Sequence, residues 1–115
     1  MEKINEQLSQ DFVFLKDDSK LHYVPLRDIF FVKGEGNYSI VHTRERKFVM
    51  RSSLKRFFEI LPQLQFVQIH RSYIVQIPHI KLIDLGEGQV HLQSQEVLPV
   101  SRRFRLELVS TLPVF

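Results

Sequence analysis

The sequence predicts a mostly β domain of the α+β class, and three observations lead to this prediction. Short runs rich in phenylalanine, valine and isoleucine recur between turn residues, which is typical of antiparallel strands. Only two segments show the three- and four-residue spacing of an amphipathic helix. The chain has 115 residues, 43% of them hydrophobic, and this length is sufficient for one hydrophobic core. We therefore expect one domain built mainly from strands.

Ten runs have the character of strands, and the residues between them indicate how they connect. The first two runs flank Asp17-Asp18-Ser19, which predicts a hairpin. Gly34-Glu35-Gly36-Asn37 and Leu85-Gly86-Glu87-Gly88 contain residues that tolerate positive φ, so they also predict hairpin connections. The ten runs are Phe12–Leu15, Leu21–Val24, Ile29–Lys33, Tyr38–Thr43, Lys47–Arg51, Phe66–Ile69, Tyr73–Ile77, Lys81–Leu85, Gln89–Gln93 and Val97–Val100.

Two segments break the two-residue period and fit helices. Each starts after a serine at the expected N-cap, Ser53 or Ser101, and each ends at a proline, Pro62 or Pro113. The first helix should cover a sheet face, and the second should be a C-terminal helix. Their apolar stripes are Leu54, Phe57, Phe58 and Leu61 in the first and Phe104, Leu108 and Leu112 in the second.

The chain divides into a polar N-terminal segment and a domain. Residues 1–10 are polar and weakly patterned, so we expect an arm or linker stub there and the domain at residues 11–115. The chain has no cysteine, which excludes disulfides and thiol chemistry and fits a cytoplasmic protein. Its apolar runs are far shorter than the roughly 20 residues that span a bilayer, so no membrane insertion is expected.

Positive charge is concentrated in the second half of the chain. Residues 44–105 hold eleven basic and five acidic side chains, whereas residues 1–43 hold five basic and seven acidic ones. This distribution is typical of proteins that bind a polyanion such as nucleic acid, although it also occurs in proteins without an anionic ligand.

The start of the second predicted helix is the first candidate contact site. In Ser101-Arg102-Arg103-Phe104-Arg105, three arginines crowd a helix start, where the helix dipole favours acidic residues. The serine cap and the backbone N–H groups could hold a phosphate, and Arg102 could reach a guanine edge. The alternative is a solvated helix face on which Arg103 pairs with Glu107.

Two predicted turns give further candidates. His70-Arg71-Ser72 can project polar groups from a sheet edge, and Gly36-Asn37-Tyr38 combines an amide that can read a base with a phenol that can reach phosphate. The alternatives are a plain turn, a surface ion pair of Arg71 and a hydrogen-bonded core position for His70. We expect simple phosphate contacts from Arg44, Arg46, Lys47, Lys55 and Arg56.

No catalytic, metal or cofactor site is predicted. The five histidines have no metal-binding spacing and no cysteine partners. The chain lacks a complete dinucleotide fingerprint, a Walker sequence and a nucleophile elbow, so the sequence does not predict an enzyme.

Five motifs follow one another in a specific order. They are Pro25-Leu26-Arg27-Asp28-Ile29-Phe30-Phe31-Val32, Gly36-Asn37-Tyr38-Ser39-Ile40-Val41-His42-Thr43, Met50-Arg51-Ser52-Ser53-Leu54, Phe66-Val67-Gln68-Ile69-His70-Arg71-Ser72-Tyr73-Ile74-Val75 and Leu98-Pro99-Val100-Ser101-Arg102-Arg103. Over about residues 11–112 the chain thereby resembles the LytTR-type DNA-binding domain, the output module of many bacterial two-component response regulators. Lys33 and Gln76 stand where this family commonly has glutamate and asparagine, and neither departure removes an expected base-reading residue.

The resemblance implies small antiparallel sheets packed side by side with short helices, whose loops enter successive major grooves. The base-reading side chains would be Asn37, Tyr38, Arg71 and Arg102. His70, Ser72, Ser101, Arg103 and Arg105 would complete the phosphate contacts. The resemblance further implies a transcriptional regulator that binds specific double-stranded DNA, as a dimer on direct repeats.

These residues do not include a phosphoacceptor domain. We therefore expect either a stand-alone regulator controlled by its expression or by a separate partner, or part of a longer response regulator with a receiver domain. Two other functions remain open at this point. Exposed strand edges could bind an extended segment of a partner protein, and exposed aromatic side chains could bind single-stranded RNA.

Overall fold

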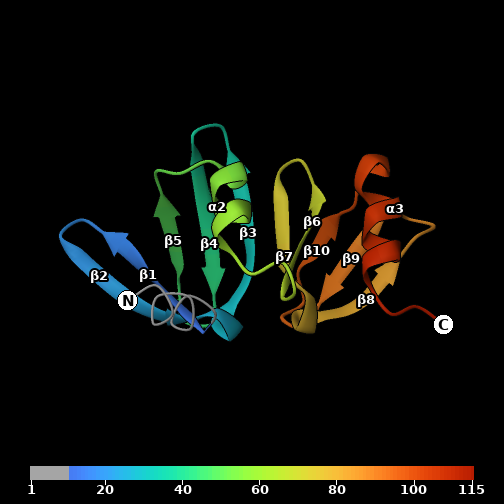
Figure 1. The fold of residues 1–115 in the computed structure, drawn as a ribbon, viewed down its shortest axis with the longest axis horizontal. Helices are drawn as coiled ribbons and strands as arrows, with labels where there is room; N and C mark the ends of the chain where they lie inside the picture. Colours follow the sequence, from blue (N-terminus) through green and yellow to red (C-terminus); the bar gives the residue numbers. More distant parts are fainter. Residues whose placement is uncertain (1–10) are drawn as a thin grey trace.

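Three antiparallel sheets lie side by side along the longest axis of the molecule (Figure 1). The computed structural model describes residues 11–115, so the arm expected at residues 1–10 lies outside the described residues. The sheets have two, five and three strands, and the five-stranded sheet lies between the other two. This arrangement, with its short helices, confirms the predicted fold class.

The strands follow the predicted runs to within two residues. β1 (Phe12–Asp17) and β2 (Lys20–Pro25) form the two-stranded sheet. The five-stranded sheet has the order β5-β4-β3-β7-β6, and the three-stranded sheet has the order β10-β9-β8. The bounds are β3 (Ile29–Glu35), β4 (Tyr38–Thr43), β5 (Lys47–Met50), β6 (Phe66–His70), β7 (Tyr73–Gln76), β8 (Ile80–Asp84), β9 (Gln89–Leu92) and β10 (Val97–Pro99).

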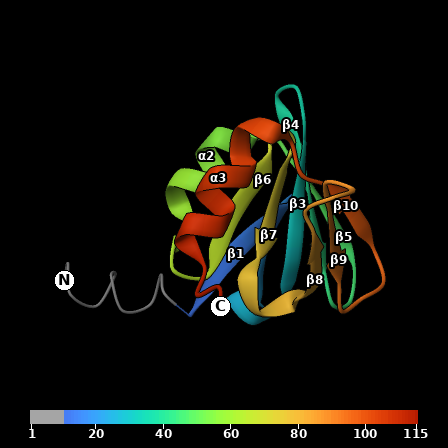
Figure 2. The same cartoon turned by 90° about the vertical axis from the view of Figure 1, so that its right-hand side faces the viewer.

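The two predicted helices, α2 (Leu54–Ile60) and α3 (Arg102–Thr111), lie on the same side of the sheets (Figure 2). They are separated along the longest axis of the molecule, with β6 and β7 between them (Figure 1). Ser53 caps α2 as predicted, because its Oγ accepts a hydrogen bond from the Arg56 N–H at 3.3 Å. Ser101 occupies the N-cap of α3, but its hydroxyl makes no capping bond. The Phe104 N–H, which the hydroxyl was expected to cap, donates instead to the Ser101 carbonyl at 3.1 Å.

The central sheet contributes to two hydrophobic cores, one on each face. Successive residues of a strand point to opposite faces, so Val32 and Ile74 belong to a core with Leu54 of α2. Phe31 and Val75 belong to a second core, shared with the three-stranded sheet and α3. The central sheet therefore holds both outer sheets and both helices in position.

Two 3-10 turns that the sequence did not predict connect the sheets. η1 (Leu26–Asp28) links β2 to β3, and η2 (Ile77–His79) links β7 to β8. Gln76, which is 5% exposed, donates from Nε2 to the Leu26 carbonyl at 2.8 Å and so joins the two connections. The Gln76 side chain is thus used in a buried hydrogen bond between the two connections.

Substitution of Ser39 tests how the segment between β5 and α2 is held in place. The Ser39 side chain is completely buried, and its Oγ donates to the Ser52 carbonyl at 2.6 Å. Ser39→Ala should lower the free energy of unfolding by about 1–3 kcal/mol, because the Ser52 carbonyl loses its partner. The measurement is urea unfolding.

Ser110→Ala is the matched control, since the exposed Ser110 Oγ also donates to a carbonyl, that of Glu107 at 3.1 Å. It should change the unfolding free energy by less than about 0.5 kcal/mol. Equal losses in the two variants would contradict the role given to Ser39.

Candidate nucleic-acid interface

Three loops end at the same edge of the molecule (Figure 1). They are the β3–β4 turn, the β6–β7 turn and the start of α3. We call residues Gly36–Tyr38, His70–Ser72 and Ser101–Arg103 the loop edge. The structure therefore brings together all four predicted base-reading residues, and Asn37, Tyr38, Arg71 and Arg102 are all exposed.

Backbone hydrogen bonds hold the three loops next to one another. The Gly34 N–H, just before the β3–β4 turn, donates to the Ser72 carbonyl at 2.8 Å. The Ser101 N–H donates to the Ile69 carbonyl at 3.0 Å. The β6–β7 hairpin is therefore bonded to a neighbouring loop on each side, and these bonds do not depend on the side chains that project from the loops.

The β3–β4 turn is tight because Glu35 and Tyr38 already pair across the two strands. Only Gly36 and Asn37 remain to make the connection. Gly36 has φ 63°, a left-handed conformation that glycine adopts without steric cost. The turn thus places the Asn37 amide at its tip and leaves the Tyr38 side chain next to it, 45% exposed.

His70 organises the β6–β7 turn. Its Nδ1 accepts a hydrogen bond from the Ser72 N–H at 3.0 Å, which places the proton of the neutral ring on Nε2. The Tyr73 ring packs against the imidazole with the centroids 5.7 Å apart. Arg71, at the tip of this turn, is exposed, and no described residue forms an ion pair with it.

The arginines at the start of α3 differ in their surroundings. Arg102 and Arg103 are exposed. The guanidinium of Arg103 lies 5.4 Å from the Phe104 ring centroid, and no ion pair with Glu107 is present among residues 11–115. Arg105 is half-buried, with its Nε shielded from solvent and without a described partner. It therefore does not project from the loop edge.

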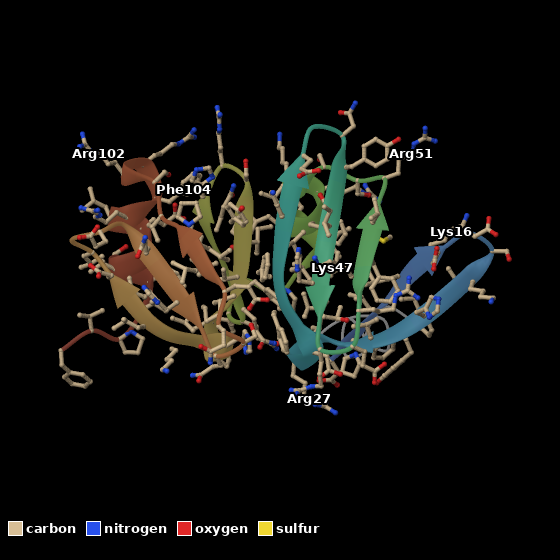
Figure 3. All side chains as sticks on the ribbon, turned by 180° about the vertical axis from the view of Figure 1, so that it is seen from behind. Lys16, Arg27, Lys47, Arg51, Arg102 and Phe104 are labelled. Carbon is tan, nitrogen blue, oxygen red and sulfur yellow. The ribbon has the colours of Figure 1, made fainter. Side chains whose placement is uncertain are left out.

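Further cations lie at the start of α2 and just before it. Lys55 and Arg56, in the first turn of α2, are exposed and without ion pairs in the described part of the chain. Figure 3 shows Arg51 at the same side of the molecule as Arg102, and Arg27 at the opposite side. Sequence reasoning did not select Arg51, since only its positive charge distinguished it.

The structure does not bring Arg44, Arg46 and Lys47 to the loop edge. They follow β4, which runs away from that edge, so they lie at the opposite end of the central sheet. Arg44 Nε lies 3.3 Å from Asp28 Oδ1, and Arg46 Nη2 lies 3.0 Å from Asp17 Oδ2. Two of these three cations are thus already paired with carboxylates of the same chain.

Aromatic rings also pack against these arginines. The Arg46 guanidinium lies 4.1 Å from the Phe48 ring centroid, and that of Arg44 lies 5.6 Å from Phe30. His79 stacks on Phe30 at 3.8 Å, and burial lowers the pKa of His79 below its usual value. This end of the sheet is therefore packed and internally paired, in contrast to the loop edge.

Residues 11–115 contain no group of three or more histidine, aspartate or glutamate side chains that could hold a metal ion. Within the same range, no helix is long and apolar enough to cross a membrane. The geometry that stands out is the loop edge, where a sheet scaffold presents exposed, unpaired guanidinium groups. Such a site defines a domain suited to binding a polyanion.

Comparison with known proteins identifies the class of this domain. Residues 19–112 match the family described as LytTr DNA-binding domain, and the chain belongs to that family. It is also similar to the solved LytTr DNA-binding domain of a putative methyl-accepting/DNA response regulator from Bacillus cereus. That match has a TM-score of 0.79 and 26% identity, and it covers 90% of this chain and 98% of the other.

Several relatives are named as transcriptional regulators. One is the transcriptional regulatory protein YpdB of Escherichia coli O6:H1, 30% identical over 64% of this chain and 30% of its own length. Another is the heme-containing CO-sensing transcriptional regulator RcoM 2 of Paraburkholderia xenovorans, 30% identical over 84% of this chain and 38% of its own. LytR of Staphylococcus aureus is 31% identical over 56% of this chain and 26% of its own. The chain thus spans about a third of these relatives.

The difference between the two ends of the sheet predicts different effects on stability. Arg46→Gln removes an ion pair and a contact with an aromatic ring, so it should lower the free energy of unfolding by about 1 kcal/mol. Arg102→Gln should change it by less than about 0.5 kcal/mol, because Arg102 forms no ion pair with any residue of the range 11–115. Urea unfolding of both variants at low salt tests this, and an Arg102→Gln loss as large as that of Arg46→Gln would contradict the assignment.

Proposed function

We propose that this domain recognises a specific sequence in double-stranded DNA and acts as the DNA-reading part of a transcriptional regulator. The observation that carries the proposal is the loop edge, where three loops held by backbone hydrogen bonds present exposed polar side chains. Among them are arginines that form no ion pair with a residue of the range 11–115. Membership of the LytTr DNA-binding domain family supports it independently. The regulator names of the relatives support the transcriptional role.

Base reading would come from Asn37, Tyr38, Arg71 and Arg102. An arginine can donate two hydrogen bonds to the O6 and N7 atoms of guanine in the major groove, and an asparagine amide can pair in the same way with adenine. Tyr38, next to Asn37 at the turn, offers a hydroxyl to a base edge or a phosphate oxygen.

Phosphate contacts would come from the residues around these four. Lys55, Arg56 and Arg103 supply positive charge, and the Nε2–H of His70 and the Ser72 hydroxyl can donate to phosphate oxygens and so fix the position of the protein on the duplex. A phosphate contact of Ser101 stays a prediction, since its Oγ is shielded from solvent. We add Arg51, because it lies at the same side of the molecule as Arg102. The phosphate contacts predicted from sequence for Arg44, Arg46, Lys47 and Arg105 stay an untested prediction. We leave them out of this proposal, because none of these residues projects from the loop edge.

The shape of the domain supports reading of more than one groove. The loops follow one another along the longest axis of the molecule (Figure 1). A row of loops can track a duplex, and we infer that loops at different positions on this edge enter successive major grooves. Two copies would then bind two direct repeats as a dimer on DNA, with control supplied by a receiver domain or a separate partner.

The test is selection from a random duplex library at about 150 mM salt, followed by fluorescence anisotropy on the enriched and a scrambled duplex. Arg102→Ala should lose about 1–3 kcal/mol on the enriched duplex and relax specificity at one base pair, because a base contact is lost. Lys55→Ala should weaken binding to both duplexes equally and reduce the salt slope by about one.

Arg27→Ala is the control, since Arg27 is exposed at the side opposite the loop edge (Figure 3). It should leave affinity and salt slope nearly unchanged. If no motif is enriched and Arg102→Ala binds as the wild type does, the proposal of sequence-specific binding fails. A pair of short repeats in the enriched duplexes would support the direct-repeat arrangement.

A further inference from the structure

A groove of about 420 Å³ is lined by residues of α2, of β6 with the β6–β7 turn, and of the first turn of α3. Leu54 and Phe58 of α2 and Phe104 of α3 give it an apolar surface. Its volume is in the range of about 300–1,000 Å³ that accommodates small organic ligands. It is therefore large enough for a molecule with a flat ring system.

The charged residues of the groove are mostly cationic. Lys55, Arg71 and Arg103 line it, whereas Glu59 is its one carboxylate. None of the three cations forms an ion pair with a residue of the described part of the chain. A ligand that enters the groove therefore meets unneutralised positive charge next to aromatic and aliphatic side chains.

We propose that this groove binds small aromatic carboxylates and that their binding competes with DNA. A phosphate group alone would use the cations but leave the apolar surface unoccupied, and a neutral aromatic molecule would do the reverse. An aromatic ring with one carboxylate uses both features. The competition rests on the proposed function, because Lys55, Arg71 and Arg103 are also expected to contact DNA.

The groove is physically connected to the loop edge. Gln68 lines it, and its Nε2 donates to the His70 carbonyl at 3.1 Å, at the base of the β6–β7 turn. Arg71 belongs to both the groove and the turn. A carboxylate that draws the Arg71 guanidinium into the groove withdraws it from the edge that would face the duplex.

Binding is tested directly with 2-naphthoate and its neutral analogue 2-naphthamide, by titration of the 15N-labelled protein followed by NMR. We expect naphthoate to bind with a dissociation constant on the order of 1 mM, with shift changes at the residues that line the groove. Naphthamide should bind at least about fivefold more weakly. Equal affinity of the two compounds, no binding at all, or shift changes outside the groove would overturn the proposal.

Exposed residues provide variants that keep the fold. Lys55→Gln should weaken naphthoate binding by about threefold, and Glu59→Gln should strengthen it by a similar factor. Arg27→Gln, at the side opposite the loop edge (Figure 3), removes the same charge and should have no effect. If Arg27→Gln weakens binding as much as Lys55→Gln does, the attraction comes from net charge and the groove assignment is wrong.

Competition is measured separately, by anisotropy on the enriched duplex with 5 mM naphthoate or naphthamide at matched ionic strength. Naphthoate should weaken DNA binding severalfold more than naphthamide does. If naphthoate binds in the groove but leaves DNA affinity unchanged, the shared use of Arg71 is refuted. Absence of DNA binding without any ligand would instead refute the proposed function, while the NMR titration still decides the groove.

Discussion

The β6–β7 hairpin is hydrogen-bonded through its backbone on both sides, to Gly34 before the β3–β4 turn and to Ser101 at the start of α3. These two bonds fix the spacing of the three loops that form the loop edge. Because neither bond uses a side chain, the residues at the loop tips can differ between proteins of this fold without a change in loop position. Positioning of the loops is thus a property of the backbone, and the proposed recognition would depend on the exposed side chains Asn37, Tyr38, Arg71 and Arg102.

The second organising feature is the way the chain distributes its charge. Arg44 and Arg46 are paired with Asp28 and Asp17 at one end of the central sheet, where they join the two-stranded sheet and η1 to the β4–β5 turn. The exposed cations of the loop edge have no such partners among the described residues. Charge that is already neutralised within the protein contributes little to polyanion binding. The electrostatic field of the unpaired cations at the loop edge would therefore determine where a duplex binds.

Much of the fold could be predicted from local sequence, and less of the site. The strands and helices could be predicted because apolar periodicity and turn residues such as Gly36 act on the backbone over a few neighbouring residues. The ion pairs of Arg44 and Arg46 and the inward position of Arg105 depend on residues far apart in sequence. The same is true of the groove that α2, β6 and α3 line. The inactive cap of Ser101 reflects a local choice, in which the Phe104 N–H donates to the Ser101 carbonyl and not to its hydroxyl. For Asn37, Arg71 and Arg102, local turn chemistry was sufficient to predict exposure, because loop tips project into solvent.

We expect DNA to bind at the loop edge and not at the basic turn between β4 and β5. The decisive measurement is the change in backbone amide NMR signals when the enriched duplex is added. Signals of residues 36–38, 70–72 and 101–103 should change, and those of residues 44–47 should not. Changes centred on residues 44–47, with the three loops unaffected, would contradict this expectation.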